Sequence, residues 1–81
     1  MIFIDNMNSK EIKNILTEVF PKSKIPKKIN GLKINDLKEW DSLGNFNLLL
    51  AVEEKYKIKF SMKEISEIKS IKSLLIHLKK K

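Results

Sequence analysis

The sequence predicts a small all-α fold: a bundle of three main helices, one short third helix and a long first loop. Three separate segments carry apolar residues at helical spacing, and serine or asparagine capping signals stand at or near helix starts. No segment pairs a convincing strand pattern with a partner strand. The 81 residues, 42% hydrophobic and 33% charged, suffice for one domain, residues 1–81, with one modest core.

The first helix is expected between a capping signal and a proline. Asn8 precedes Glu11 by three residues, the capping-box spacing in which each side chain satisfies the other residue's backbone N–H. Pro21 cannot continue a helix and marks its end. The inward stripe would consist of Ile12, Ile15, Leu16, Val19 and Phe20.

Residues 21–40 predict a long loop. They contain both prolines and Gly31, and their apolar residues follow no helical period. A loop of this length is uncommon in a compact domain and points to a functional or partly ordered segment. We expect a short turn around Asn35–Asp36–Leu37.

The segment 42–56 predicts the second helix, capped by Asp41 or Ser42. Its apolar residues cover nearly the whole circumference in the middle, which favours a helix at the buried centre of the bundle. Residues 57–60 alternate like a strand but have no partner strand, so we expect an extended connector.

Two further helices follow. Ser61 and Glu64 form a second capping box, which opens a short helix through about Ile68. Ser70 caps the last helix, and the lysines at 79–81 suit the negative end of its dipole. The inward stripe of this helix would be Ile71, Leu74, Leu75 and Leu78.

Composition excludes several function classes. Without cysteine and with one histidine, the chain offers no thiol nucleophile, no cysteine-based metal site and no multi-histidine centre. The longest apolar run, Leu48–Val52, is too short to span a membrane, and Met1–Ile4 meets Asp5 too soon for a secretory signal. A cytoplasmic protein is therefore expected.

The net charge is +7, and all the basic residues that contribute to it are lysines. A basic surface raises nucleic acid as a partner, but arginine is absent and the lysines are spread along the chain. We therefore favour a solvated lysine surface. The alternative is a basic helical module that binds nucleic acid or another protein without being modified.

The tripeptide Asp41-Ser42-Leu43 is the strongest candidate for chemistry. A serine in the first turn of a helix is presented to solvent, and a phosphate ester there would face free N–H groups. Alone, the tripeptide is typical of a simple helix cap. As a hydrolase nucleophile Ser42 lacks an adjacent base, because the single histidine, His77, is expected to be a solvated surface residue. No enzymatic activity is predicted.

The residues around this tripeptide carry a resemblance to a known family. The stretch from 39 to 48, EWDSLGNFNL, and the stretch from 53 to 60, EEKYKIKF, are similar to the acyl carrier proteins. They look most like the subgroup with a Trp-Asp-Ser-Leu-Gly motif before a Glu-Glu pair. The resemblance covers nearly the whole chain.

The resemblance implies an acyl-carrier-like four-helix bundle. A phosphopantetheinyl transferase would move 4′-phosphopantetheine from coenzyme A onto Ser42, with Asp41 and Leu43 flanking the attachment point. The thiol of that arm would carry an acyl or aminoacyl group as a thioester between acyl-loading and acyl-transfer enzymes, in lipid, fatty acid or related biosynthesis. No metal of its own, no nucleic-acid partner and no membrane partner are expected, and the chain would act as a monomer.

The resemblance also implies roles for individual residues. Partner recognition would fall to Asp41, Leu43, Phe46, Glu53 and Glu54. For Glu53 and Glu54, the residues themselves are equally consistent with an exposed helix face that contacts no partner. The acyl pocket or core would be formed by Phe46, Leu50, Phe60, Ile65, Ile68 and Leu75. Trp40 is expected to pack on the bundle as a hydrophobic lid.

This chain departs from the family in its charge, since much of the family is strongly acidic. Gly44 and Asn47 stand where acidic residues are frequent, although they fit the subgroup. We therefore expect dedicated partner enzymes. Bulky apolar residues of the last two helices are expected to fill the bundle and leave little room for a long acyl chain.

Overall fold

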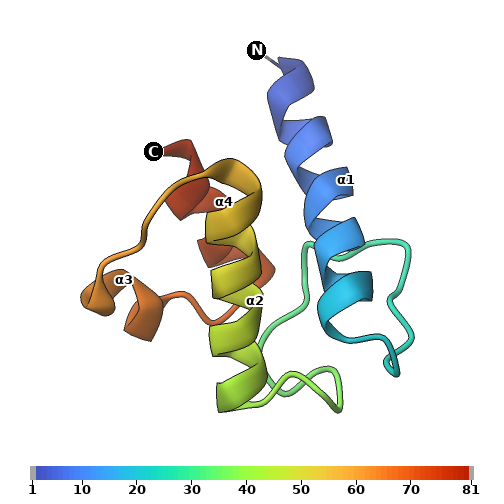
Figure 1. The fold of residues 1–81 in the computed structure, drawn as a ribbon. Coiled ribbons are helices and arrows are strands. Elements are labelled where there is room, and N and C mark those ends of the chain that lie inside the picture. The colour runs from blue at the N-terminus through green and yellow to red at the C-terminus, as the bar shows by residue number, and fades with distance from the viewer. Residues whose placement is uncertain (1, 81) are drawn as a thin grey trace.

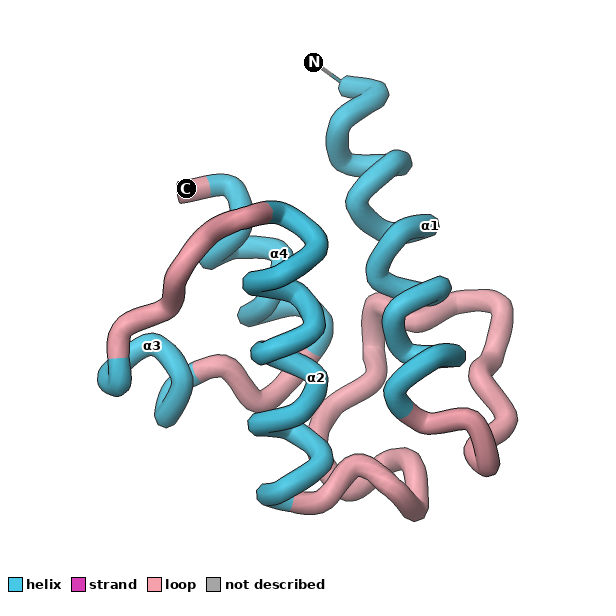
Figure 2. Tube along the Cα trace, viewed as in Figure 1, coloured by secondary structure: helices cyan, strands magenta, loops and turns pink. Residues whose placement is uncertain are grey.

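The computed structural model describes residues 2–80, and for residues 2–8 it describes the backbone alone. The chain forms four helices, α1 (Ile2–Val19), α2 (Ser42–Tyr56), α3 (Met62–Glu67) and α4 (Ile71–Lys79) (Figures 1 and 2). No strand occurs within residues 2–80, where extended pairing is limited to one isolated bridge between Lys33 and Ser70. The predicted all-α fold, with three main helices and a short third one, is confirmed.

Helix α1 begins earlier than the sequence predicts. Its backbone is helical from Ile2, so Asn8 lies within the helix and not at its start, and the expected capping box with Glu11 is wrong as a helix boundary. The side chain of Asn8 lies outside the described residues. Neither proline nor glycine stands between Ile2 and Asn8 to stop the helix, and extending an existing helix is easier than starting one. The end before Pro21 is as predicted.

The long loop between α1 and α2 is held by its own side chains. The Glu39 carboxylate accepts hydrogen bonds from the Lys22 N–H (2.9 Å) and the Ser23 hydroxyl (3.0 Å), which joins the beginning of the loop to its end. The Asp36 carboxylate accepts from the backbone N–H and the ammonium group of Lys33 at 2.9 and 3.1 Å. These hydrogen bonds lower the pKa of Asp36. The loop is thus ordered, and the turn expected around residues 35–37 is present.

Backbone hydrogen bonds attach the middle of this loop to the junction between α3 and α4. The Ile34 N–H donates to the Lys69 carbonyl (2.8 Å), and the Ile71 N–H donates to the Leu32 carbonyl (3.0 Å). These two bonds flank the bridge between Lys33 and Ser70. The loop and the start of α4 therefore form one unit.

The core lies between α2 and the elements around it. Figure 1 shows α1 on one side of α2, α3 on the other and α4 behind it. The fully buried side chains include Ile12, Leu16, Phe20, Trp40, Leu48, Leu49, Val52, Ile68, Ile71 and Leu74. Most come from helices, but Phe20, Trp40 and Ile68 come from residues next to them.

The expectation that α2 forms the buried centre of the bundle is correct for one face of the helix and wrong for the other. Leu48, Leu49 and Val52 are buried, whereas Leu43, Phe46 and Leu50 are exposed over 68, 42 and 44% of their surface. The neighbouring elements cover two sides of α2 and its back, and none lies in front of it in Figure 1. The part of the chain that the structure describes has no further helix on that face.

The C-terminal half has the predicted caps. Ser61 accepts from the Glu64 N–H while the Glu64 carboxylate accepts from the Ser61 N–H, the reciprocal pair of a capping box. Ser70 caps α4 in the same way, with Ser73 as its partner. After the last helical residue of α2, Tyr56, the C-cap Lys57 is left-handed and thus differs from the expected extended conformation. Residues 58–60 form a connector that is neither helix nor strand.

Helix α2 is also joined to α1 near its C-terminal end. The Tyr56 hydroxyl donates a hydrogen bond to the Glu11 carboxylate at 2.8 Å. Burial, together with this carboxylate, raises the pKa of Tyr56.

No helix in the described part of the chain has both the length and the apolar character needed to cross a membrane.

Candidate functional site

The first turn of α2 presents Ser42 to solvent. Asp41 is the N-cap: its carboxylate accepts from the Gly44 N–H (2.8 Å), and its carbonyl accepts from the Asn45 N–H (2.7 Å). Of the two capping residues that the sequence allows, the structure therefore selects Asp41. Ser42 is the first helical residue and is exposed. Its hydroxyl has no part in the cap and is accessible to another molecule.

The start of α2 lies directly against the end of the loop because residue 44 is glycine. A Cβ atom there would overlap with the carbonyl oxygen of Glu39 and would lie 3.1 Å from the ring of Phe20. The carbonyl oxygen is a backbone atom, so no side-chain rotation could relieve the overlap. Gly44 thus permits the close approach that sets where Ser42 begins the helix.

A buried polar network fastens the same junction. The Trp40 indole N–H donates to the Asn45 side-chain oxygen (2.9 Å), and the Asn45 amide donates to the Ile68 carbonyl (2.8 Å). Trp40 is completely buried and stacks on Phe20 with ring centroids 5.9 Å apart. The expectation that Trp40 packs on the bundle is confirmed, and its N–H group has the partner that burial requires.

Sequence reasoning missed the positioning roles of Gly44 and Asn45. A signal for Asn45 was present, since it is a polar residue on the face of α2 that also carries Leu48, Leu49 and Val52. A polar residue on a buried face needs hydrogen-bond partners. Those partners, Trp40 and Ile68, could not be identified from spacing alone.

The residues expected to contact partners divide into two groups. Leu43, Phe46 and Glu54 are exposed on the uncovered face of α2, and Asp41 is exposed at its start. Glu53 is buried, with a carboxylate oxygen that accepts from the Phe60 N–H at 2.7 Å. The prediction of a partner contact for Glu53 is therefore wrong, because this carboxylate holds the connector after α2.

The residues expected in the acyl pocket or core also fall into a buried group and an exposed group. Phe60 and Ile68 are buried, and Ile65 and Leu75 are partly buried against the core. Phe46 and Leu50 are exposed, so their assignment to the core is wrong. Leu50 instead borders an open hollow on the surface, whose other lining residues are Glu53, Glu54, Lys57, Ile58 and Lys59.

His77 does not approach Ser42. Its ring is half-buried in α4, with Nδ1 2.9 Å from the Ser73 carbonyl and Nε2 3.8 Å from the Glu67 carboxylate. The expectation that His77 is a solvated surface residue is therefore wrong, since its side chain is only 16% exposed. Figure 1 places the C-terminal end of α4 and the start of α2 at opposite ends of the fold.

The site thus consists of an exposed serine at a firmly positioned helix start, next to a carboxylate and an exposed apolar face. Among the side chains described for residues 9–80, no three of histidine, aspartate or glutamate gather in a way that could hold a metal ion. No protein-family model, curated protein or solved structure matches this chain.

Proposed function

We propose that the protein is an acyl carrier whose 4′-phosphopantetheine arm is attached to Ser42. One observation carries the proposal: Ser42 is exposed at the first position of α2, while the residues around it are fixed by Gly44 and by the buried pair Trp40 and Asn45. A modifying enzyme needs an accessible hydroxyl in a constant position. This junction supplies both.

The residues at the start of α2 fit a phosphodiester on Ser42. Asp41 caps the Gly44 N–H, whereas the first N–H groups of any helix have no partner within the helix. Those of Ser42 and Leu43 would favour the negative charge of the phosphate, aided by the helix dipole. The arm would supply a thiol, which this cysteine-free chain lacks.

The uncovered face of α2 supports a role in recognition. Leu43 and Phe46 follow Ser42 within about one helical turn and remain exposed. Exposed apolar side chains on a small protein are typical of interaction surfaces when they gather on one face. Enzymes that load or unload the arm would contact Leu43 and Phe46, with Asp41 and Glu54 at the ends of this surface.

The test is transfer of phosphopantetheine from coenzyme A by a transferase of broad specificity, followed by intact mass measurement. The wild-type chain should gain one phosphopantetheine, and Ser42→Ala should gain none. Ser66→Ala is the matched control, since Ser66 is also exposed and lies on α3, away from the start of α2. This control should be modified like the wild type.

Leu43→Ala gives a second readout. Leu43 is exposed, so its truncation should leave the thermal unfolding temperature nearly unchanged while it slows the transfer. A folded wild-type chain that stays unmodified with several such transferases would overturn the proposal. So would a Ser42→Ala variant that is modified as well as the wild type.

A further inference from the structure

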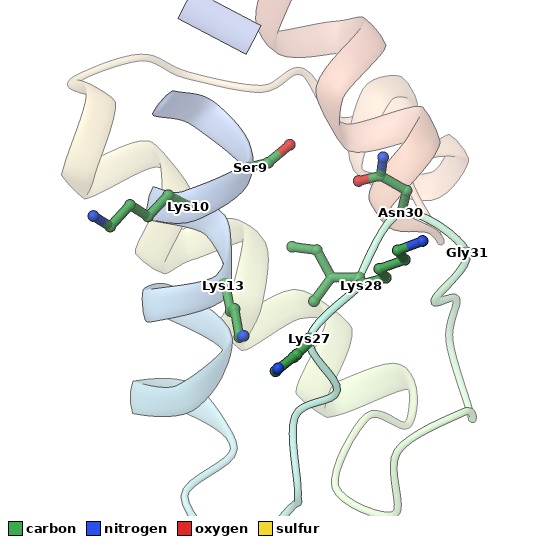
Figure 3. Close-up of a pocket in the computed structure, with 8 residues that line it drawn as sticks. Ser9, Lys10, Lys13, Lys27, Lys28, Asn30 and Gly31 are labelled. Atoms are coloured by element: carbon green, nitrogen blue, oxygen red, sulfur yellow. The ribbon is translucent and has the colours of Figure 1, made fainter. Parts of the chain in front are cut away.

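A basic hollow lies on a different part of the surface, between α1 and the long loop (Figure 3). We call it the lysine hollow. It is lined by Ser9, Lys10, Lys13, Lys27, Lys28, Ile29, Asn30 and Gly31. Figure 3 shows the ammonium ends of Lys13, from the helix, and Lys27, from the loop, pointing toward one another across it.

The lining of this hollow contains no carboxylate among the described side chains. Two ion pairs lie among the side chains described for residues 9–80, Lys33 with Asp36 and His77 with Glu67, and neither includes a lysine of the hollow. The ammonium groups of Lys13 and Lys27 converge, whereas those of Lys10 and Lys28 point away from the hollow in Figure 3. Like charges that converge repel each other. A bound anion would attract both ammonium groups and would offset the repulsion between them.

We propose that the lysine hollow binds a compact anion bearing two or more phosphate groups. Lys13 and Lys27 would hold the phosphates from opposite walls. Ser9 and Asn30 belong to the same lining, and Figure 3 shows their polar ends at its other end, where they could donate hydrogen bonds to a more distant phosphate of the ligand. Lysine is a common phosphate ligand in proteins because it acts as a compact point charge with three donors.

The lining favours a small oligophosphate over a nucleic acid or a membrane. Proteins that bind single strands combine basic grooves with aromatic rings on which bases stack, and no aromatic residue lines this hollow. Membrane-binding surfaces add exposed apolar side chains to their lysines. The one apolar residue here, Ile29, is buried.

The hollow also has room for a longer ligand. Asn30 and Gly31 line a second hollow as well, which reaches Lys72 and Lys79 on α4. The lysine hollow and this second hollow therefore adjoin each other at Asn30 and Gly31. Each added phosphate should find further lysines, so the affinity should rise from pyrophosphate to triphosphate.

The experiment is calorimetric titration of the full chain with inorganic pyrophosphate and triphosphate at low and physiological salt. Triphosphate should bind more tightly than pyrophosphate, and added salt should weaken both. The double variant Lys13→Gln, Lys27→Gln should lose about tenfold in affinity, given a few-fold loss for each exposed charge. Amide chemical shifts of Asn30 and Gly31 should move on titration of the wild type.

The matched control is Lys38→Gln, Lys63→Gln, which has the same net charge but alters exposed lysines outside the hollow. This control variant should lose less than about twofold in affinity for pyrophosphate and triphosphate. The single variants Lys13→Gln and Lys27→Gln, each with a loss of a few-fold in affinity, repeat the test if the double variant fails to fold. Equal losses in hollow and control variants would overturn the proposal. Binding only to an oligothymidylate or only to phosphatidylserine vesicles would overturn it as well.

Discussion

Replacing Asn45 by alanine should destabilise the fold far more than an ordinary helix substitution. Asn45 is only 6% exposed and is the partner of both the Trp40 indole N–H and the Ile68 carbonyl. Its removal leaves a buried donor and a buried acceptor without partners, at about 1–3 kcal/mol each. The expected loss is therefore about 2–6 kcal/mol, a large fraction of the stability of a small domain.

The assay is urea unfolding followed by the fluorescence of Trp40, the single tryptophan of the chain. Trp40 is fully buried and stacked on Phe20, so its emission reports on the junction directly. Thermal unfolding gives a second measurement: a loss of 2 kcal/mol in unfolding free energy corresponds to a fall of roughly 8–16 °C in melting temperature for a domain of this size.

Asn47→Ala is the control for this prediction. Asn47 lies on the same helix, two residues further on, but is exposed. The same change there should leave the stability unchanged or slightly raise it, because alanine favours helices more than asparagine does. If the two variants unfold within about 0.5 kcal/mol of each other, the network does not hold the junction as argued.

Two other perturbations test separate parts of the loop. Gly44→Ala should lower the unfolding free energy by about 1–2 kcal/mol in urea titration, because the overlap with the Glu39 carbonyl outweighs the better helix propensity of alanine; a gain in stability would contradict this. Asp36→Asn should reduce stability above the ordinary carboxyl pKa, where the lowered pKa of Asp36 makes its bonds to Lys33 stabilising. That difference should vanish as the pH falls through the folded-state pKa, and a difference that persists in urea titrations at lower pH would refute it.

Local capping chemistry made much of this fold predictable. The starts of α2, α3 and α4 follow from Asp41, Ser61 and Ser70, whose side chains bond N–H groups only three residues away. Asn8 and Glu11 have the same spacing yet fall inside α1. A capping pattern therefore locates a helix start only where the preceding residues cannot be helical.

The candidate site was less predictable because its geometry depends on distant residues. Periodicity identifies α2 as a helix, but a helix that is apolar nearly all round does not reveal which face stays uncovered, so Phe46 and Leu50 were misassigned to the core. The role of Glu53 depends on the connector that folds back to place the Phe60 N–H beside it. The exposed position of Ser42, in contrast, follows directly from the motif.

The backbone hydrogen bonds between residues 32–34 and 69–71 make the loop before α2 dependent on the C-terminal helix α4. Because main-chain groups form these bonds, most side-chain substitutions would leave the link intact, whereas deleting α4 would remove the Ile71 N–H that the Leu32 carbonyl accepts from. Shortening the protein at its C-terminus should therefore disturb the loop that leads into Ser42, some thirty positions earlier in the sequence.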